Sequence, residues 1–342
     1  MRAKSLSDLA QLSGLSISTV SRALSGHWSV AEGTRERVRA LAGQHGYRPN
    51  EMARNLRLQR TNAIGIAWPL GHAEGQHLTD PFFLSLVGHV ADALVMQGYD
   101  IVLSRVLPAS DDWLDRLVDS GKIDGLILIG QSDQADTIAR VARRYPPLVV
   151  WGADLPGAGY PTVGSDNDAG GRAAARHLLD RGRRRFVFVG DPALPEFGQR
   201  LAGFRATAEA AGAAVAVVRA AATFDEADAA VRGWWQGGGR ADALFAASDV
   251  AAIGAMRALV TAGVQVPEEV AIVGYDDVTI AAHTTPALTT IRQDVAEGAR
   301  LLVAALFARL AGDEAPSSLL PAPLVVRGST GSAGGPPLAA HG

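Results

Sequence analysis

The sequence predicts an all-α unit at the N-terminus, followed by an α/β domain of two lobes that each hold a doubly wound parallel sheet. The first observation behind this prediction is that residues 5–25 read as two short helices joined by a tight turn. The second is that short apolar runs alternate with amphipathic stretches from residue 63 onward, in two successive series. Runs such as 125–130 are apolar throughout, which is typical of parallel strands covered on both faces.

The two N-terminal helices carry start and stop signals of their own. Ser5 can cap the first helix, and Asp8 three positions later completes a capping box. Gly14 provides the left-handed backbone that the turn needs, and Ser16 can cap the second helix. Val20 points back toward a core, which leaves a polar outer face on the second helix. This helix-turn-helix pattern is a device for inserting a helix into the major groove of DNA, and an ordinary helical hairpin is the alternative.

A third helix and a linker follow. Residues 34–41 place Val38 on an inner face with arginines outside, and the helix is expected to end near Gly46. Pro49 breaks this helix, and residues 50–57 then form a further short helix with a narrow apolar stripe. A helix of this length is marginal alone, so we expect it to order only when something packs against it.

The charge distribution divides the chain. Residues 1–60 carry ten Lys and Arg against four Asp and Glu, whereas the remainder carries 22 against 31. The overall formal charge of −3 conceals this asymmetry. A basic end on an acidic body is the electrostatic footprint of DNA binding confined to the N-terminus. The charge therefore favours DNA binding over a plain hairpin.

Composition limits the classes of protein and of site that are expected. No cysteine is present, which excludes disulfides, thiolate metal sites and cysteine nucleophiles. No signal peptide is expected, because Ser5, Ser7 and Asp8 interrupt any apolar run at the start. No apolar segment reaches the roughly 18 residues that a membrane span needs. We therefore expect a cytoplasmic protein with no membrane contact, no metal and no cofactor.

The apolar and amphipathic segments after residue 63 define two lobes. In the first series, we expect strands at 63–68, 99–103, 123–129 and 148–151, with helices at 81–98, 113–120 and 137–144. In the second series, we expect strands at 185–189, 214–218, 243–246 and 270–274, with helices at 169–181, 199–211, 224–235 and 249–262. Parallel sheets of this kind bind ligands outside the carboxyl ends of their strands. The cleft between the lobes is therefore the expected ligand site.

The N-terminal region resembles the DNA-binding headpiece and hinge of the lactose-repressor (LacI/GalR) family of bacterial transcription regulators. The resemblance covers residues 5–60 without a gap. The strings that carry it are Ser16-Ile17-Ser18-Thr19-Val20-Ser21-Arg22-Ala23-Leu24, Thr34-Arg35-Glu36-Arg37-Val38 and Gly46-Tyr47-Arg48-Pro49-Asn50. One departure is Ala31, where the family often has a Ser or Thr cap for the third helix.

The rest of the chain, from residue 63 to about 327, resembles the periplasmic-binding-protein-like effector domain of the same family. Matching strings include Asp80-Pro81-Phe82-Phe83, Ser165-Asp166-Asn167-Asp168 and Pro286-Ala287-Leu288-Thr289-Thr290-Ile291-Arg292-Gln293. The resemblance implies a headpiece at 1–47, a hinge at 48–60 and an effector domain at 61–327. It also implies crossings between the lobes near 160, 287 and 318, with helix 294–311 returning to the first lobe.

The C-terminal segment 328–342 is rich in Gly, Ser and Pro, and we expect a flexible tail there. No heptad helix follows the effector domain, so the tetramerising zipper of some family members is missing. We therefore expect a homodimer that forms through the effector lobes. A twofold dimer implies a palindromic DNA operator.

The DNA contacts divide into phosphate contacts and base contacts. The side chains expected to donate to phosphates are Ser16, Ser21, Ser25, Thr34 and Asn50. Ile17, Ser18 and Arg22 lie on the exposed side of the second helix, and by resemblance these positions read bases. Arg22 can reach guanine N7 and O6 with two parallel hydrogen bonds. For Ser18 and Ser21, a solvated polar face is the alternative.

The linker carries one further candidate contact with DNA. Leu56, which precedes Arg57, resembles the hinge leucine that family members wedge into a central base step of the minor groove. Its alternative role is core packing, but an apolar residue among charged and polar neighbours has little core to enter. We therefore place Leu56 and Arg57 in the DNA interface.

Two charged residues are the leading candidates for effector binding. Arg200 matches an arginine that bonds ligand oxygens in sugar-responsive members, and Asp276 matches an aspartate that accepts from sugar hydroxyls. A polyol needs such paired donors and acceptors in a dry cleft. Asp249 is a further candidate, with capping of helix 249–262 as its alternative role. Ser248 stands where many members have Asn, which leaves the identity of the sugar open.

Further candidates surround these residues. The aromatic side chains that can stack on a pyranose ring are Trp68, Phe82 and Trp151. Asp80 can bind ligand or cap the helix that Pro81 opens. His72 and His77 are five positions apart in a glycine-containing loop, and we interpret them as surface residues rather than metal ligands.

The resemblance implies a repressor of carbohydrate-utilisation genes that a small sugar releases from its operator. A regulator that responds to a purine or a phosphosugar is the alternative, although only Arg200 stands out as a cation among the cleft strings. A sugar-binding or sugar-processing enzyme is the remote alternative. No Gly-x-Gly-x-x-Gly, P-loop or Gly-x-Ser-x-Gly motif follows any expected strand, which argues against an enzyme.

Overall fold

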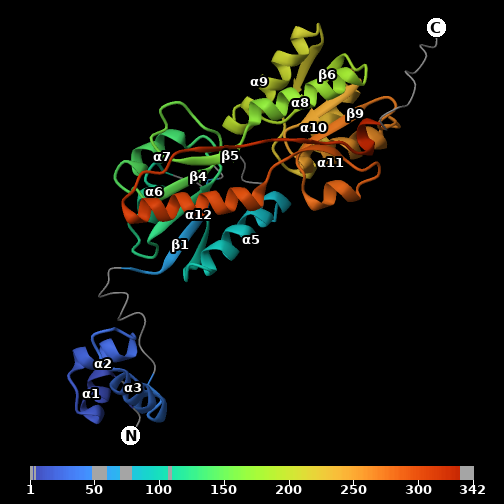
Figure 1. The fold of residues 1–342 in the computed structure, drawn as a ribbon. Helices are drawn as coiled ribbons and strands as arrows, with labels where there is room; N and C mark the ends of the chain where they lie inside the picture. The colour runs from blue at the N-terminus through green and yellow to red at the C-terminus, as the bar shows by residue number, and fades with distance from the viewer. Residues whose placement is uncertain (1–2, 4, 48–59, 70–78, 107–109, 332–342) are drawn as a thin grey trace, which may run out of the picture. The chain divides into compact units, whose positions relative to one another are not determined.

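The computed structural model describes residues 3, 5–47, 60–69, 79–106 and 110–331 (Figure 1). The chain divides into two compact units, Met1–Thr61 and Asn62–Gly342. Within the described ranges, no helix combines the length and the apolar character that crossing a membrane requires.

The first unit is a cluster of three helices. They are α1 (Leu6–Ser13), α2 (Ile17–Leu24) and α3 (Glu32–Gln44). Every helix contributes to the core, whose fully buried side chains include Leu9 of α1, Val20 and Ala23 of α2, and Val38 of α3. The expected helix-turn-helix is therefore present, and a third helix completes its core.

The caps of these helices agree with the sequence signals. Ser5 and Asp8 form a capping box, in which each side chain accepts a hydrogen bond from the other residue's amide. Gly14 has a φ of 71°, in the left-handed region that a turn after α1 requires. The Ser16 side chain accepts from an amide in the first turn of α2, whereas Ala31 provides no side-chain cap for α3.

The first lobe of the second unit contains a six-stranded sheet in the order β11-β5-β4-β3-β1-β2, and every neighbouring pair is parallel. The strands are β1 (Ala63–Pro69), β2 (Asp100–Val106), β3 (Gly125–Ile129), β4 (Leu148–Trp151), β5 (Thr162–Ser165) and β11 (Ser318–Leu320). One face is covered by α5 (Pro81–Val95) and α12 (Val295–Ala311), which lie side by side (Figure 1). The other face is covered by α6 (Trp113–Val118) and α7 (Ala135–Ala142).

The second lobe repeats this three-layer arrangement, with strand order β12-β10-β9-β8-β6-β7. Its strands are β6 (Arg185–Val189), β7 (Ala214–Val218), β8 (Ala243–Ala246), β9 (Ala271–Asp276), β10 (Thr289–Arg292) and β12 (Leu324–Val325). Only β12 runs antiparallel to its neighbour. Its helices are α8 (Asn167–Asp180) and α9 (Pro195–Ala210) on one face, and α10 (Phe224–Gln236) and α11 (Asp249–Thr261) on the other. Two short 3₁₀ helices, η1 (Thr279–His283) and η2 (Gly328–Thr330), complete the lobe.

Two glycines allow α8 and α9 to pack closely. A Cβ atom at Gly171 would lie 2.1 Å from the carbonyl oxygen of Arg200, and one at Gly203 would lie 2.0 Å from that of Asp168. Real Cβ atoms do not approach backbone this closely, so only glycine fits at either position. The contact seats α9, which carries Arg200, directly on α8.

The crossings between the lobes correct the sequence expectation. The chain leaves the first lobe after β5, returns after β10 and leaves again after β11. Each crossing therefore lies a few residues beyond the expected positions of 160, 287 and 318. These three strands were not predicted, because they carry polar residues instead of a continuous apolar run, and the two-residue β12 was not predicted either. The return of helix 294–311 to the first lobe is confirmed by the packing of α12 on α5.

The start of the C-terminal tail also differs from the expectation. Flexibility was expected from residue 328, but Gly328–Thr330 forms η2, and Ser329 is fully buried. The Ser329 hydroxyl donates to the Ile272 carbonyl over 2.6 Å and accepts from the Thr289 amide over 2.8 Å. Composition alone missed this docking, because it depends on partners far away in the sequence. Residues 332–342 lie outside the described residues.

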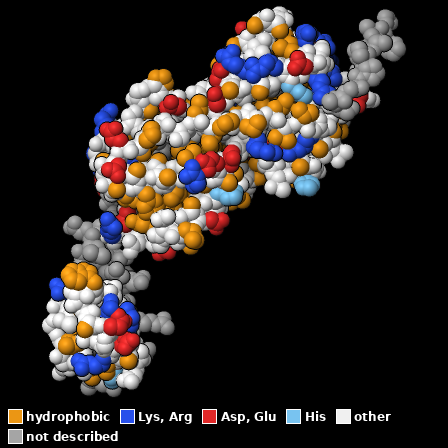
Figure 2. All heavy atoms as spheres, in the orientation of Figure 1, with side chains coloured by type: hydrophobic (Ala, Val, Ile, Leu, Met, Phe, Trp, Pro, Cys, Tyr) orange, Lys and Arg blue, Asp and Glu red, His pale blue; other side chains and the backbone are white. Residues whose placement is uncertain are grey.

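Apolar side chains are exposed on the first lobe. Leu84, Val95 and Met96, on α5 or directly after it, are 54%, 66% and 84% exposed. Figure 2 shows hydrophobic side chains gathered over the side of this lobe that α12 and α5 cover. Such a surface on a folded domain is typical of a protein–protein contact.

Candidate functional site

The exposed face of α2 carries the three predicted base-reading residues. Ile17 is 48% exposed, and Ser18 and Arg22 are also exposed. Val20 and Ala23 lie on the opposite face, where both are fully buried. The apolar positions of α2 thus fix its orientation in the three-helix core and leave Ile17, Ser18 and Arg22 facing solvent.

The predicted phosphate donors differ in their surroundings. The Ser16 hydroxyl lies 2.9 Å from that of Ser18, and it also accepts from the Thr19 amide as the helix cap. Ser25 is exposed, and its hydroxyl donates to the Arg22 carbonyl over 3.1 Å. Ser21 is half-buried.

Thr34, in the first turns of α3, is also half-buried. The predicted contacts Asn50, Leu56 and Arg57 lie outside the described residues, as does most of the expected hinge at 48–60. The described part of the predicted DNA interface therefore consists of the exposed face of α2, its flanking serines and Thr34 of α3.

The second unit has a pocket between its lobes, at the carboxyl ends of the strands of both sheets. Seven of the eight predicted effector residues line it: Trp68, Asp80, Phe82, Trp151, Arg200, Ser248 and Asp276. Trp68 and Trp151 come from the ends of β1 and β4, and Asp276 comes from the end of β9. A pocket thus lies at the place where the sequence predicts the ligand site, with lining residues from both lobes.

Arg200 is held firmly on the floor of this pocket. Only 4% of the residue is exposed, and its Nε atom donates to Asn167 Oδ1 over 2.8 Å. One terminal nitrogen donates to the carbonyl of Ala247, and the guanidinium lies over the Tyr275 ring at 3.6 Å. The guanidinium is therefore positioned before any ligand arrives.

Asp276 faces Arg200 across the same floor. Its Oδ1 atom lies 3.9 Å from an Arg200 terminal nitrogen and accepts from Gln293 Nε2 over 2.8 Å. Burial raises the pKa of Asp276 to about 7, and the positive charge of Arg200 opposes this rise. Asp276 has a φ of 119°, which turns the chain at the end of β9 and presents the carboxyl to the pocket.

Asp249 was predicted to bind the effector, but it does not line the pocket. It is fully buried beneath it, where Oδ2 accepts from the Val278 amide over 2.9 Å and Oδ1 accepts from the Thr290 hydroxyl over 2.5 Å. Its alternative role as helix cap is also wrong, since the Ser248 side chain caps α11. Asp249 instead ties the start of α11 to the segments after β9 and within β10.

Asp80 has both of the roles that the sequence left open. Its Oδ1 atom accepts from the Phe82 amide over 2.9 Å and caps α5, and the residue also lines the pocket. Burial raises the pKa of Asp80, and the hydrogen bond from Phe82 opposes that rise.

Aromatic rings form a wall of the pocket on the side of the first lobe. Trp68 meets Phe83 edge to face at 5.5 Å, and Phe82 lies 5.9 Å from Trp151. The Trp68 Nε1 atom is buried without a hydrogen-bond partner among the described residues. A buried donor of this kind in a pocket wall is a candidate for a contact with a ligand acceptor.

Several lining residues were missed, and Glu196 is the most informative. It lies in the first turn of α9, which begins at Pro195, four residues before the expected start at 199. The Glu196 Oε1 atom is buried and has no partner among the described residues. Burial raises the pKa of this carboxyl, and the charge of Arg200 opposes the rise. The Pro-Glu pair, a frequent opening of helices, was the signal that could have found it.

The other missed residues come mainly from segments without regular structure. They are Pro69, Phe83, Ile129, Gly130, Ser132, Leu194, Phe197, Ala222 and Gln293. Among the described residues, no cluster of three or more His, Asp or Glu side chains is arranged to hold a metal ion. His72 and His77 lie outside the described residues.

Both units of the chain match families of known proteins. Residues 5–50 match the family described as "Bacterial regulatory proteins, lacI family", and residues 175–330 match the "Periplasmic binding protein-like domain". The HTH-type transcriptional regulator CelR of Thermobifida fusca is 32% identical over 313 residues, which cover 88% of this chain and 92% of that protein.

Solved structures extend the similarity to the fold. A structure described as a transcriptional regulator CelR–cellobiose complex has a TM-score of 0.70 and 30% identity, covering 96% of this chain and all of that one. The lac repressor dimer bound to operator and the anti-inducer ONPF has a TM-score of 0.83 at 24% identity, covering 97% and 100%. The helix-turn-helix unit and the two-lobed domain of this chain are consistent with its similarity to CelR. The chain belongs to the lacI family of bacterial regulatory proteins and is a DNA-binding transcriptional regulator.

Proposed function

We propose that this regulator is a repressor of carbohydrate-utilisation genes, and that a small neutral sugar bound between the lobes releases it from its operator. The observation that carries the proposal is the composition of the pocket, in which aromatic rings line the same cavity as Arg200 and Asp276. Sugars present apolar C–H faces that pack on rings and hydroxyls that need both donors and acceptors. The relative CelR, whose structure is described with cellobiose, supports this class of ligand.

The charge of the pocket favours a neutral sugar over a phosphosugar. Three carboxyls, those of Asp80, Glu196 and Asp276, line it together with Arg200. The Arg200 guanidinium is already engaged by Asn167 and by the Ala247 carbonyl. A phosphate entering this site would meet these carboxyl groups, and the described lining residues include no further cation to balance its charge.

The DNA side of the proposal rests on the exposed face of α2. Ile17, Ser18 and Arg22 face solvent together, as a helix that enters the major groove requires. The flanking hydroxyls supply phosphate contacts, while the hinge residues Leu56 and Arg57 contact the minor groove. A homodimer formed through the exposed apolar face near α5 would present two such helices to a palindromic operator.

Coupling between the two sites follows from the position of the pocket. The Gln199 side chain of the second lobe donates to the Asp154 carbonyl of the first over 3.3 Å, so the lobes touch directly beside the pocket. A ligand that contacts both lobes changes their preferred angle. Sugar and operator then weaken each other's binding by the same factor. We place this protein in the bacterial cytoplasm and assign it no enzymatic activity.

The experiment first selects a duplex from a random-sequence library with the full-length protein. It then measures release of that duplex by cellobiose, glucose, ribose, glucose 6-phosphate and hypoxanthine. At least one neutral sugar should release the duplex, and the phosphate and the purine should not. Release by glucose 6-phosphate or hypoxanthine alone would overturn the sugar assignment.

Arg22→Ala tests the reading of bases by α2. The variant should lose most of its preference for the selected duplex over random DNA, because a bidentate guanine contact supplies roughly 1–3 kcal/mol of discrimination. Binding to random DNA and its salt dependence should be nearly unchanged. If the variant still prefers the selected duplex as strongly as the parent protein does, Arg22 does not read the operator.

A further inference from the structure

The loop between α2 and α3 exposes a tryptophan. Trp28 is 86% exposed, the largest value among the exposed large hydrophobic side chains of the described residues. Tryptophan is usually highly buried, and a full indole surface in water is unfavourable. A large, rigid aromatic side chain in solvent is a candidate anchor for a binding partner.

The loop that presents Trp28 is fixed at both ends. The His27 amide donates to the Arg22 carbonyl over 2.9 Å, which folds the loop back on the last turn of α2. Arg35 of α3 donates to the Gly26 carbonyl over 3.0 Å, and Val30 anchors the other end in the core. The loop is therefore held in place by contacts with both helices.

The indole is also supported from one side. The His27 ring stacks on Trp28 with centroids 5.6 Å apart and an angle of 26°. His27 Nδ1 in turn accepts from the Ser29 amide over 3.2 Å, which holds the imidazole in the loop. The aromatic pair loses little conformational freedom when a partner binds, because its geometry is already set.

The position of the loop indicates which partner covers it. Trp28 follows the carboxyl end of the helix that carries Arg22, and residues 1–60 have ten basic against four acidic side chains. Because the loop folds back on the last turn of α2, a polyanion bound along that helix would lie beside it. In DNA, the apolar surface at the edge of the groove is the deoxyribose of the backbone.

We propose that Trp28, backed by His27, packs on the deoxyribose groups of the DNA backbone beside the site that α2 reads. The proposal rests on DNA binding by α2, and it adds a sequence-independent apolar contact. A sugar contact of this kind strengthens binding to every duplex equally. It also leaves the salt dependence unchanged, because no charge meets a phosphate.

The test compares full-length Trp28→Ala and Trp28→Phe with the parent protein on a selected duplex and on a random duplex of equal length, over a range of salt concentrations. Trp28→Ala should weaken binding to both duplexes by about tenfold, as expected for an aromatic anchor, at an unchanged salt slope. Trp28→Phe should recover most of the loss. Leu12→Ala, which truncates another exposed apolar side chain of this unit, is the matched control and should bind normally.

Three results would overturn the proposal. Unchanged binding by Trp28→Ala would show that another partner covers the indole. A loss confined to the selected duplex would assign Trp28 to base reading, and a reduced salt slope would assign its effect to phosphates. If the parent protein binds neither duplex, DNA binding itself fails, which is a different outcome from failure of the Trp28 contact. Unfolding curves of each variant establish that a loss of binding does not reflect a loss of fold.

Discussion

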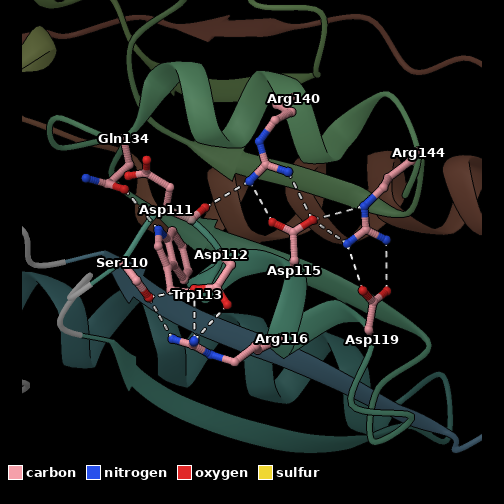
Figure 3. A network of polar contacts seen from close by, with 10 residues as sticks. All are labelled: Ser110, Asp111, Asp112, Trp113, Asp115, Arg116, Asp119, Gln134, Arg140 and Arg144. Atoms are coloured by element: carbon pink, nitrogen blue, oxygen red, sulfur yellow. Dashed lines mark hydrogen bonds and ion pairs between the residues drawn. The ribbon is translucent and has the colours of Figure 1, made fainter.

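The second unit contains two groups of arginine and aspartate side chains, and the pKa of the aspartate shifts in opposite directions in the two groups. Between the lobes, Asp276 is buried beside Arg200, and burial raises its pKa to about 7. On the outside of the first lobe, Asp115 of α6 accepts hydrogen bonds from Arg140 and Arg144, each over 2.6 Å (Figure 3). These hydrogen bonds hold the pKa of Asp115 far below its ordinary value.

The comparison shows that the direction in which the pKa of an aspartate shifts depends on its access to water rather than on the mere presence of an arginine. The Arg200 guanidinium lies 3.9 Å from Asp276 and is shared with Asn167 and a backbone carbonyl, so it only partly offsets the cost of burial. Asp115 is 22% exposed and keeps its solvation while it receives two direct ion pairs. The exposed network joins α6 to α7, whereas the buried carboxyl of Asp276 lies beside Arg200 and accepts a hydrogen bond from Gln293.

The largest effect is expected from Asp249→Ala. The variant removes an acceptor from the Val278 amide and from the Thr290 hydroxyl, both in the interior. We expect a loss of about 2 kcal/mol in the free energy of unfolding, since buried donors without partners are costly. Urea denaturation measures it, with Asp249→Asn as the control that keeps one acceptor and loses less. A stability equal to that of the parent would mean that this buried carboxyl is no structural tie.

Next in size is the effect of Asp276→Ala on the effector response. The variant should bind the selected duplex normally without sugar, yet need at least tenfold more sugar for release, because it lacks the acceptor for a ligand hydroxyl. Titration of the duplex complex with the active sugar measures this. A folded variant that fails to bind the duplex even without sugar would show that Asp276 serves structure instead.

A smaller effect is expected from pH. A sugar hydroxyl that donates to Asp276 favours the ionised carboxylate, so sugar affinity should rise severalfold as the pH increases through about 7. For folding the sign is reversed, since a raised pKa favours the protonated native state. This carboxyl should therefore lower stability as the pH rises from its unfolded value of about 4 toward 7. Calorimetric titration at several pH values tests the first statement, and Asp276→Asn should remove the dependence.

The smallest effect should come from the exposed network. Asp115→Asn breaks the ion pairs to Arg140 and Arg144 and should lower the free energy of unfolding by no more than about 1 kcal/mol, less in high salt. The lowered pKa means that this contribution is full above about pH 4 and is lost as the pH falls further. Thermal unfolding at low and high salt measures it. Asp119→Asn, which loses only the pair with Arg144, should cost less.

The sequence predicted the architecture because its signals are local. Ser5, Gly14 and Ser16 fixed the N-terminal helices through caps and a turn within a few residues of each other. The apolar strands β3 and β4 were equally clear, because parallel strands buried on both faces read as continuous runs. Short strands such as β5 carry no such run, and they form only because a neighbouring sheet edge accepts them.

The lining of the pocket could be predicted only in part. Arg200 and Asp276 were found through family strings, and both line the pocket. Glu196 was missed because the expected helix began four residues too late, at 199 instead of 195. Asp249 was misplaced because its partners, Val278 and Thr290, lie some 29 and 41 positions away. No local pattern reveals which of two adjacent polar residues caps a helix and which turns inward.

The close contact of α8 and α9 has a consequence for the effect of mutations. Gly171 and Gly203 do not line the pocket, yet a Cβ atom at Gly171 would meet the backbone of α9, which carries Arg200, and one at Gly203 would meet the backbone of α8, so either would push the two helices apart. Every substitution in the first two bases of a glycine codon either adds a side chain or ends the protein. Mutations that abolish the effector response are therefore expected outside the pocket as well as within it. Mutations at these two codons would have the phenotype of pocket mutations while leaving every ligand-contacting side chain intact.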